Sequence, residues 1–425
     1  MTTFTADAAA QLPGPAWLRE QRIAAAERFA GASLPTETEE VWRYSRISEL
    51  DLDAFAPLVD GPTTEDGIPD ALQPLIDAVG ERAGLLVLRN GRIAHRELDP
   101  DLEAKGVQLR VLDEGCMGSV ATAADVFTDL ATAFTADGAL VRVPRGVVVP
   151  RPIVVLQWID ADGSAVFPRL VVQAGEASQV TVLDHLSSPA GVHALTAPVA
   201  ELDVADAANL SYLNVQELGS SVWQVGYQAS RVGRDATLDS SVVALGGDYA
   251  RVRADSRLAG QGGSSNLLAV YFGDGRQMHD FRTMQDHEAP KTTSDLLFKG
   301  AVEDNAHSVY SGLIRVRKGA KGTNAFQTNR NLVLTEGAHA DSVPNLEIEE
   351  NDVSCSHASA VGPIDEEQRY YLEARGVPTD VANRLIVLGF FNEVIERTPI
   401  AGLQPRLRGL VAAKLGSSLA GGVTS

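Results

Sequence analysis

Residues 345–376 read NLEIEENDVSCSHASAVGPIDEEQRYYLEARG, and this stretch marks the change from a β scaffold to a helical tail. It ends a long series of strand-like segments, and Gly362-Pro363 then breaks their pattern. Asp365 can cap a helix over 365–375, with Gln368 three residues later as in a capping box. The stretch therefore predicts a β scaffold that is followed by helices.

The same stretch places one of only two cysteines beside a histidine, in Val353-Ser354-Cys355-Ser356-His357. Residues two apart in a strand point to the same face, so Cys355 and His357 would lie side by side. A thiolate and an imidazole suit iron, zinc or sulfur chemistry, but two ligands are too few to complete a tetrahedral site. A metal or cluster here would need ligands from elsewhere in the chain or from a partner. The alternative is that Cys355 is a small buried apolar residue.

Short apolar runs, separated by Gly, Asp, Asn or Pro, continue from about residue 84 to 357 and predict strands, with no helix between 137 and 357. A weak repeat accompanies them, since Ala306-His307 recurs 32 residues later as Ala338-His339. Irregular repeats of this kind are typical of a parallel β-helix, in which each coil pairs with its neighbours. A large antiparallel sandwich is the alternative that the strand count leaves open.

Helical patterns precede the strands. Pro15 can open a helix over about 15–30, and one short helix is expected within 118–136. Residues 60–80 are rich in Pro and Gly and predict a linker or irregular cover. Trp42 and Tyr44 are expected to pack in the core, as buried aromatic residues commonly do.

Apolar residues after Thr379 follow a three- and four-residue spacing, which predicts a helix that ends before Pro399. Its apolar stripe, which includes Leu388 and Phe391, is broader than one buried face needs. We expect this helix to pack on the β core; the alternative is that part of its face receives a partner. A last helix is expected over about 403–415, and the tail from residue 416 is expected to fray.

The expected fold is mainly β: a right-handed parallel β-helix core over 81–360, between an N-terminal helical region over 1–80 and a C-terminal helical domain over 361–425. A net charge of −20 argues against binding to nucleic-acid backbones or to anionic membranes. Two cysteines in 425 residues exclude a disulfide framework. The N-terminal stretch lacks the features of a secretion signal, and no apolar run is long enough to span a membrane, so we expect a cytoplasmic protein.

Three acidic–histidine groups could hold a metal, but we expect solvated loops or turns, since no third ligand is visibly paired with any of them. They are Asp184-His185, His279-Asp280 and Asp286-His287-Glu288. Cys116 lies beside acidic residues, which would raise the pKa of its thiol, so we expect a structural role. The sequence contains no G-x-x-x-x-G-K-[ST] phosphate loop, so the chain should not hydrolyse ATP itself.

Three runs resemble the SufB/SufD family of iron–sulfur cluster assembly scaffolds, and its SufD branch most. They are NAHSVYSGLIRV at 305–316, TNAFQTNRNLVL at 323–334 and CSHASAVGPIDEEQRYYLEARGV at 355–377. The resemblance covers roughly residues 130–400. It implies a non-enzymatic scaffold that pairs with a SufB-like subunit through its β core and contacts a SufC-like ATPase through its C-terminal helices. The resemblance is also compatible with a homodimer of the isolated chain.

The resemblance further implies that a transient iron–sulfur cluster forms at the subunit interface, with Cys355 and His357 as candidate ligands shared with the partner. No cofactor is expected to bind the isolated chain tightly. Complexes of this family bind a reduced flavin, but the resemblance names no residue of this chain as a flavin ligand. A SufB-like subunit is one alternative, although that subunit typically carries additional cysteines. A secreted β-helix carbohydrate lyase is another, which would need paired carboxylates and a basic residue on one face of successive coils.

Overall fold

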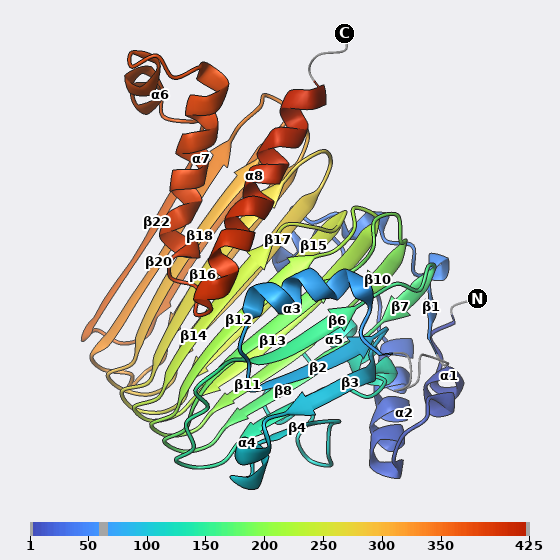
Figure 1. Ribbon diagram of the computed structural model, residues 1–425. Coiled ribbons are helices and arrows are strands. Elements are labelled where there is room, and N and C mark those ends of the chain that lie inside the picture. The colour runs from blue at the N-terminus through green and yellow to red at the C-terminus, as the bar shows by residue number, and fades with distance from the viewer. Residues whose placement is uncertain (1–2, 59–66, 422–425) are drawn as a thin grey trace.

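The computed structural model describes residues 3–58 and 67–421. Its strands form a parallel β-solenoid of about 8 turns, with helices in the N-terminal and C-terminal parts of the chain (Figure 1). The predicted parallel β-helix is therefore confirmed, and the antiparallel sandwich is wrong, because successive coils pair in parallel. No helix interrupts residues 137–357, as expected. Within the described ranges, no helix is both long and apolar enough to cross a membrane.

The chain alternates between two sheets, which we call sheet A and sheet B. Sheet A contains β4 (Gln108–Arg110), β5 (Ala139–Val143), β8 (Arg169–Ala174), β11 (Val199–Val204), β13 (Val222–Val232), β15 (Tyr249–Leu258), β17 (Met278–His287), β19 (His307–Val316) and β21 (His339–Ile348) in spatial order, with β1 (Ala56–Pro57), β7 (Ser164–Val166) and β10 (Ala194–Thr196) beside them. Sheet B contains β3 (Arg92–Leu98), β2 (Gly84–Arg89), β6 (Ile153–Trp158), β9 (Gln179–Ser187), β12 (Asn209–Glu217), β14 (Thr237–Ala244), β16 (Ser264–Gly273), β18 (Thr293–Val302), β20 (Thr323–Val333) and β22 (Val353–Gly362). Each later coil thus contributes one strand to each sheet.

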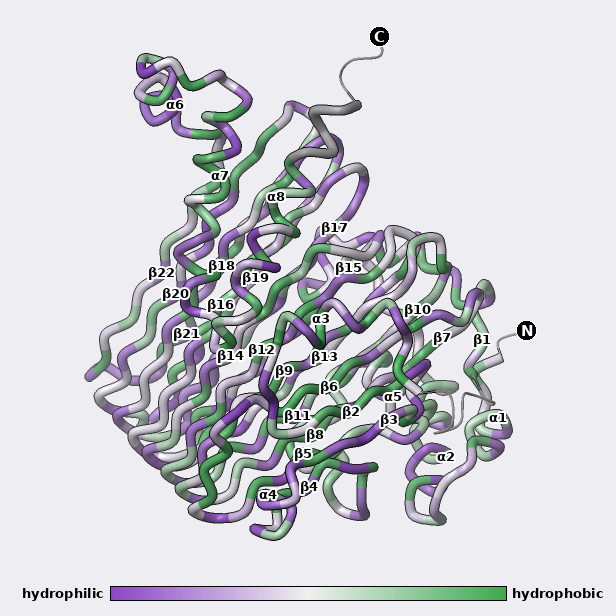
Figure 2. The backbone as a smooth tube through the Cα atoms, in the orientation of Figure 1, coloured by the Kyte–Doolittle hydropathy of each residue, from purple (hydrophilic) through white to green (hydrophobic). Residues whose placement is uncertain are grey.

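This coil geometry explains the weak sequence repeat. His307 lies directly opposite His339 on the neighbouring strand of sheet A, so the 32-residue spacing is one full coil that carries two strands. Along each strand, side chains alternate between the interior of the solenoid and its outer surface. Buried and exposed residues alternate along β20 accordingly, and Figure 2 shows polar and apolar residues interspersed along the strands.

Helices of the N-terminal part cover the outer face of sheet A. They are α1 (Ala6–Gln11), α2 (Ala16–Ala30) and α5 (Val126–Phe134), with 3-10 turns at Glu40–Trp42, Ile47–Glu49 and Leu52–Ala54. Their apolar side chains form one cluster with those of sheet A, from Phe4 and Phe127 to Trp223 and Val309. The helices expected after Pro15 and within 118–136 are both confirmed. The short helix α4 (Pro100–Ala104), beside the first coil, was not expected.

Two expectations in the N-terminal region are wrong. Tyr44 is exposed and its ring lies against the Arg43 guanidinium, 5.1 Å away, whereas Trp42 is buried as expected. Residues 60–80 are not simply a linker: 59–66 lie outside the described residues, but a 3-10 turn (Asp70–Leu72) leads into α3 (Gln73–Val79). Pro74 is compatible with α3 because it stands in the first turn, where its missing N–H costs nothing.

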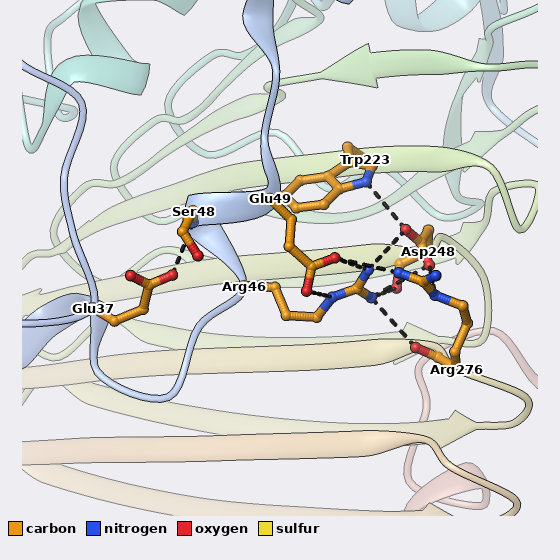
Figure 3. A network of polar contacts seen from close by, with 7 residues as sticks. All are labelled: Glu37, Arg46, Ser48, Glu49, Trp223, Asp248 and Arg276. Atoms are coloured by element: carbon orange, nitrogen blue, oxygen red, sulfur yellow. Dashed lines mark hydrogen bonds and ion pairs between the residues drawn. The ribbon is translucent and has the colours of Figure 1, made fainter.

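Arg46 fastens the N-terminal segment to the solenoid (Figure 3). Its guanidinium contacts Glu49 at 2.6 Å and Asp248, next to β15, at 3.2 Å. Asp248 also accepts a hydrogen bond from Trp223 of β13 at 3.2 Å, and Arg276, next to β17, contacts Glu49 at 3.3 Å. The hydrogen bond from Arg46 lowers the pKa of Glu49. The segment is therefore tied to three successive coils of sheet A.

Helices follow the last strand of the solenoid. They are α6 (Glu366–Glu373), α7 (Thr379–Ile395) and α8 (Gln404–Gly421), with a 3-10 turn at Ala401–Leu403, and α7 and α8 cover the outer face of sheet B. α7 and α8 lie side by side across sheet B, whereas α6 projects away from the solenoid (Figure 1). The tail expected to fray from residue 416 is instead helical to Gly421, and residues 422–425 lie outside the described residues. Our division of the chain into regions 1–80, 81–360 and 361–425 stays a prediction.

Candidate functional site

The last coil of the solenoid is open. β22 pairs only with β20, and β21 pairs only with β19, so each has one unpaired edge within the described residues. Figure 1 shows β22 at the outer edge of its sheet. Helices of the N-terminal and C-terminal parts cover the outer faces of the two sheets rather than the open end of the coil stack. An unpaired strand edge is a ready template for strand addition by another chain.

Cys355 and His357 lie on this terminal strand. Cys355 stands opposite Ala325 of β20, and His357 stands opposite Gln327. Cys355 packs partly against an apolar cluster that joins both sheets, so its face of β22 points into the solenoid. Because no further coil covers this face, Cys355 is half-buried and His357 is exposed. The two side chains thus lie at the mouth of the open coil, on one face of the strand.

The chemistry of this site is incomplete. Burial raises the pKa of the Cys355 thiol above its ordinary value, so metal binding would have to displace its proton. Among the described residues, Cys355 and His357 do not form part of a cluster of three or more ligating side chains. This arrangement agrees with the expectation of a site that a second chain completes, which stays a prediction.

The rim of the open coil combines apolar and acidic residues. Ile348 and Val361, near opposite ends of the coil, are exposed although both belong to strands. The turn that joins β21 to β22 carries Glu349 and Glu350, which accept hydrogen bonds from the backbone N–H groups of Lys318 and Gly319. Exposed apolar side chains beside unpaired strand edges are features of a protein-interaction surface.

Cys116, unlike half-buried Cys355, is fully buried. It is buried in a small apolar cluster, and its Sγ donates a hydrogen bond to the Asp113 carbonyl oxygen at 2.9 Å. Burial, with a contribution from the Asp113 carboxylate, raises the pKa of this thiol to about 11. The prediction that Cys116 is structural agrees with this environment, although burial outweighs the neighbouring acidic groups as the cause.

The acidic–histidine groups are not solvated loops, and that expectation is wrong for six of their side chains. These six are buried within β9 and β17: Asp184, His185, His279, Asp280, Asp286 and His287. Asp184 points into the solenoid, where the Tyr212 hydroxyl donates to it at 2.7 Å, whereas His185 lies 2.9 Å from Glu217 on the outer side. Adjacent residues in a strand point to opposite faces, so such a pair cannot bind one metal together.

Residues 157–390 match the family model described as SUF system FeS cluster assembly, SufBD core domain. This chain belongs to the SufBD family. An iron–sulfur cluster assembly SufBD family protein of Mycobacterium tuberculosis is 34% identical over 90% of this chain and 89% of its own length. The SufD proteins of Bacillus subtilis and Escherichia coli are each 27% identical, over 94% and 93% of this chain and 94% and 92% of their own lengths.

The family assignment confirms the resemblance and disfavours a carbohydrate lyase. This SufBD chain is thus an iron–sulfur cluster assembly family protein whose matched segment runs from β6 into α7. One cluster in it was missed by sequence reasoning: His307, His339 and Asp341 come together on sheet A. The recurrence of Ala-His one coil apart was the available signal, but it was interpreted only as a repeat.

Two buried histidines of the SufBD core should make the free energy of unfolding depend on pH. Burial lowers the pKa of His279, which also faces Lys414, and the pKa of His287, each to about 4. An unfolded histidine titrates near pH 6.5, so the unfolded chain binds more protons between pH 6.5 and 4. Stability should therefore fall as the pH drops through this window, by roughly 1 kcal/mol per histidine between pH 7 and 5.5.

Denaturant unfolding at pH 7 and 5.5 measures this effect. The variant with His279→Gln and His287→Gln should lose less stability over the same interval than the parent chain, although it starts from a lower value. His95→Gln, at a partly exposed position, is the control and should keep the parental pH dependence. An equal loss in parent and double variant would show that these imidazoles do not cause the effect.

Proposed function

We propose that this chain is a scaffold subunit, without catalytic activity of its own, of an iron–sulfur cluster assembly complex. It pairs with a SufB-like subunit through the open coil, and it contacts a SufC-like ATPase through α6 and α7. The nascent cluster, as the cargo of the complex, forms at the subunit interface. Cys355 and His357 contribute ligands that the partner completes.

The observation that carries this proposal is the position of an incomplete ligand pair on an unpaired terminal strand. A buried pair would favour a structural role, and a complete ligand set would favour a site within one chain. Cys355 is instead half-buried at the mouth of the coil and His357 is exposed beside it. Strand addition along β22 would bring a second chain next to both side chains.

Exposed apolar groups on the C-terminal helices support the contact with an ATPase subunit. α6 has no buried residue, and its Tyr370 is 72% exposed. On α7, Val381 and Leu385 are exposed one turn apart, while other apolar residues of the same helix are buried against sheet B. An apolar surface of this kind on a projecting element suits a protein partner. Only part of the broad apolar stripe is therefore needed for packing.

The cysteine content favours a SufD-like role over a SufB-like one. The chain has two cysteines, and Cys116 is buried with a raised pKa. A raised thiol pKa reduces the thiolate fraction, which is the nucleophilic and metal-binding form. Buried Cys116 is thus disfavoured as a sulfur acceptor, which leaves that role to the partner. The pKa of the Cys355 thiol is also raised, but Cys355 is only half-buried at the open coil, where it acts as a ligand once its proton is displaced.

The test is cluster formation in the complete complex, co-expressed with its partner subunits. Cys355→Ala and His357→Ala should each lower iron and acid-labile sulfide per complex severalfold, while subunit assembly is unchanged. Ser356→Ala is the matched control, because it alters the opposite face of the same strand. Parental cluster yield in both ligand variants would refute the ligand role. Failure of the chain to assemble with either partner would refute the scaffold role.

A further inference from the structure

Two histidines and an aspartate converge on the outer face of sheet A. His307 on β19 and His339 on β21 are in register, with ring centroids 5.1 Å apart. Asp341 lies two residues after His339, so it points to the same face. Its Oδ2 lies 2.7 Å from Nε2 of His307 and 3.4 Å from Nε2 of His339. The three groups each offer a ligand atom within 4.8 Å of the other two.

We propose that His307, His339 and Asp341 bind a divalent first-row transition-metal ion, of the class of Zn²⁺ or Fe²⁺. Two imidazoles and one carboxylate are a ligand set that such ions accept, with remaining positions open to water or another donor. Metal–ligand bonds of about 2.0–2.1 Å in a tetrahedral site imply ligand atoms about 3.3 Å apart. The His339–Asp341 distance of 3.4 Å already meets this spacing, and the His307–Asp341 distance of 2.7 Å would need to open by about 0.6 Å.

An ordinary hydrogen-bonded pair does not explain the arrangement. A single contact with Asp341 would suffice to hold His307, as Glu217 holds His185 elsewhere in the solenoid. That contact does not account for His339, whose Nε2 lies 3.4 Å from the same carboxylate oxygen and in register with His307. Two imidazoles and a carboxylate on adjacent strands form a preorganised set, because the parallel register holds their backbones in place.

This site is separate from the Cys355–His357 pair. Its side chains point outward from sheet A, whereas Cys355 packs toward the solenoid interior from sheet B. His307 and Asp341 have side chains 28% and 21% exposed, and that of His339 is 67% exposed. An ion would thus be anchored in the partly buried pair and remain accessible on the side of His339, next to the unpaired edge of β21.

The experiment uses the full chain carrying Cys355→Ala and His357→Ala, which removes the other candidate ligands. After metal removal, this parent is titrated with Co²⁺ by visible absorption and with Zn²⁺ against a chromophoric chelator. We expect one ion per chain. His339→Ala and Asp341→Asn should each weaken Zn²⁺ binding by at least about tenfold, because even outer-shell partners of a metal contribute that much. His95→Ala, which removes a histidine paired with Glu97 alone, should bind like the parent.

Two further readouts separate loss of a ligand from loss of the fold. His339 is exposed, so the metal-free thermal midpoint of His339→Ala should equal that of the parent; Zn²⁺ should raise the midpoint of the parent but not of the variant. Zinc-edge X-ray absorption should report nitrogen and oxygen ligands without sulfur. The proposal is overturned if the parent binds no ion at micromolar Zn²⁺, if His339→Ala binds as the parent does, or if sulfur is a ligand.

Discussion

Asp280→Asn is expected to lower the free energy of unfolding by about 3–5 kcal/mol, the cost typical of removing one partner of a buried ion pair. Asp280 is buried on β17, where its carboxylate contacts Arg251 and Arg282, each at 2.6 Å, and accepts from the Tyr249 hydroxyl at 2.9 Å. Burial alone would raise the pKa of Asp280, but the two guanidinium groups hold it below its ordinary value. Asparagine keeps the shape of the side chain and removes the carboxylate that both buried guanidinium groups contact.

The Asp280→Asn substitution should also loosen the contacts that hold residues 41–43 on the solenoid. Arg251 donates to the Val41 carbonyl oxygen at 2.7 Å, and its guanidinium lies 3.9 Å from the Trp42 ring centroid. Arg282 donates to the Arg43 carbonyl oxygen at 2.6 Å. Without Asp280 these two arginines lose the group that orients them, so limited proteolysis near Arg43 should become faster than in the parent.

Asp203→Asn is the matched control for this prediction. Asp203 pairs with Arg231 of the neighbouring coil at 2.7 Å, but the arginine side chain is 49% exposed. Exposed ion pairs contribute about 0–1 kcal/mol, so this variant should unfold almost as the parent does. Urea unfolding at pH 7 measures both variants. If Asp280→Asn loses no more stability than Asp203→Asn, the buried network is not a major source of stability.

On α7, one charge placed at two positions should have opposite consequences. Phe391→Asp should destabilise the chain by at least about 3 kcal/mol, because Phe391 is fully buried and loss of a buried phenylalanine alone costs that much. Leu385→Asp should leave the thermal midpoint nearly unchanged, since Leu385 is exposed. If α7 contacts the ATPase subunit as proposed, Leu385→Asp should nevertheless abolish its capture in a pull-down.

Val111→Asp supplies the control for this pair, because it adds the same charge to an exposed apolar position far along the chain from α7. It should retain both the thermal midpoint and the ATPase pull-down. Capture of the ATPase at parental levels by Leu385→Asp would mean that the exposed side of α7 is not its docking surface. A parental thermal midpoint for Phe391→Asp would contradict the packing of α7 on sheet B.

Local sequence patterns predicted much of this architecture. Asp365 caps α6 through the backbone N–H groups of Glu367 and Gln368, as the sequence predicted, and Gly376 adopts a φ of 83° just after the helix. These features depend on residues within one helical turn of each other. The placement of Cys355 and His357 on one strand also followed from their spacing, whereas their role as cluster ligands stays a prediction.

Errors arose where a residue depends on partners one coil away. Asp280 was expected in a solvated loop because no third ligand was visibly paired with it. It is buried instead, since its partner Arg251 lies opposite it on the neighbouring strand of sheet A, in addition to Arg282 two residues away. Residues 60–80 were expected to be irregular, but the apolar residues of α3 are held by the outer face of sheet B. In both cases, tertiary contacts outweigh the local preference of the segment.

The sequence by itself determined the strands, the coil repeat, the helix boundaries near Asp365 and the family, because each is encoded in neighbouring residues or in a regular spacing. Only the tertiary structure decided that the last coil is uncovered, that Asp280 is buried between two arginines, and that His307, His339 and Asp341 meet. The physical reason is the stacking of coils: it brings side chains about 30 residues apart into contact, and those pairings depend on register rather than on local propensity.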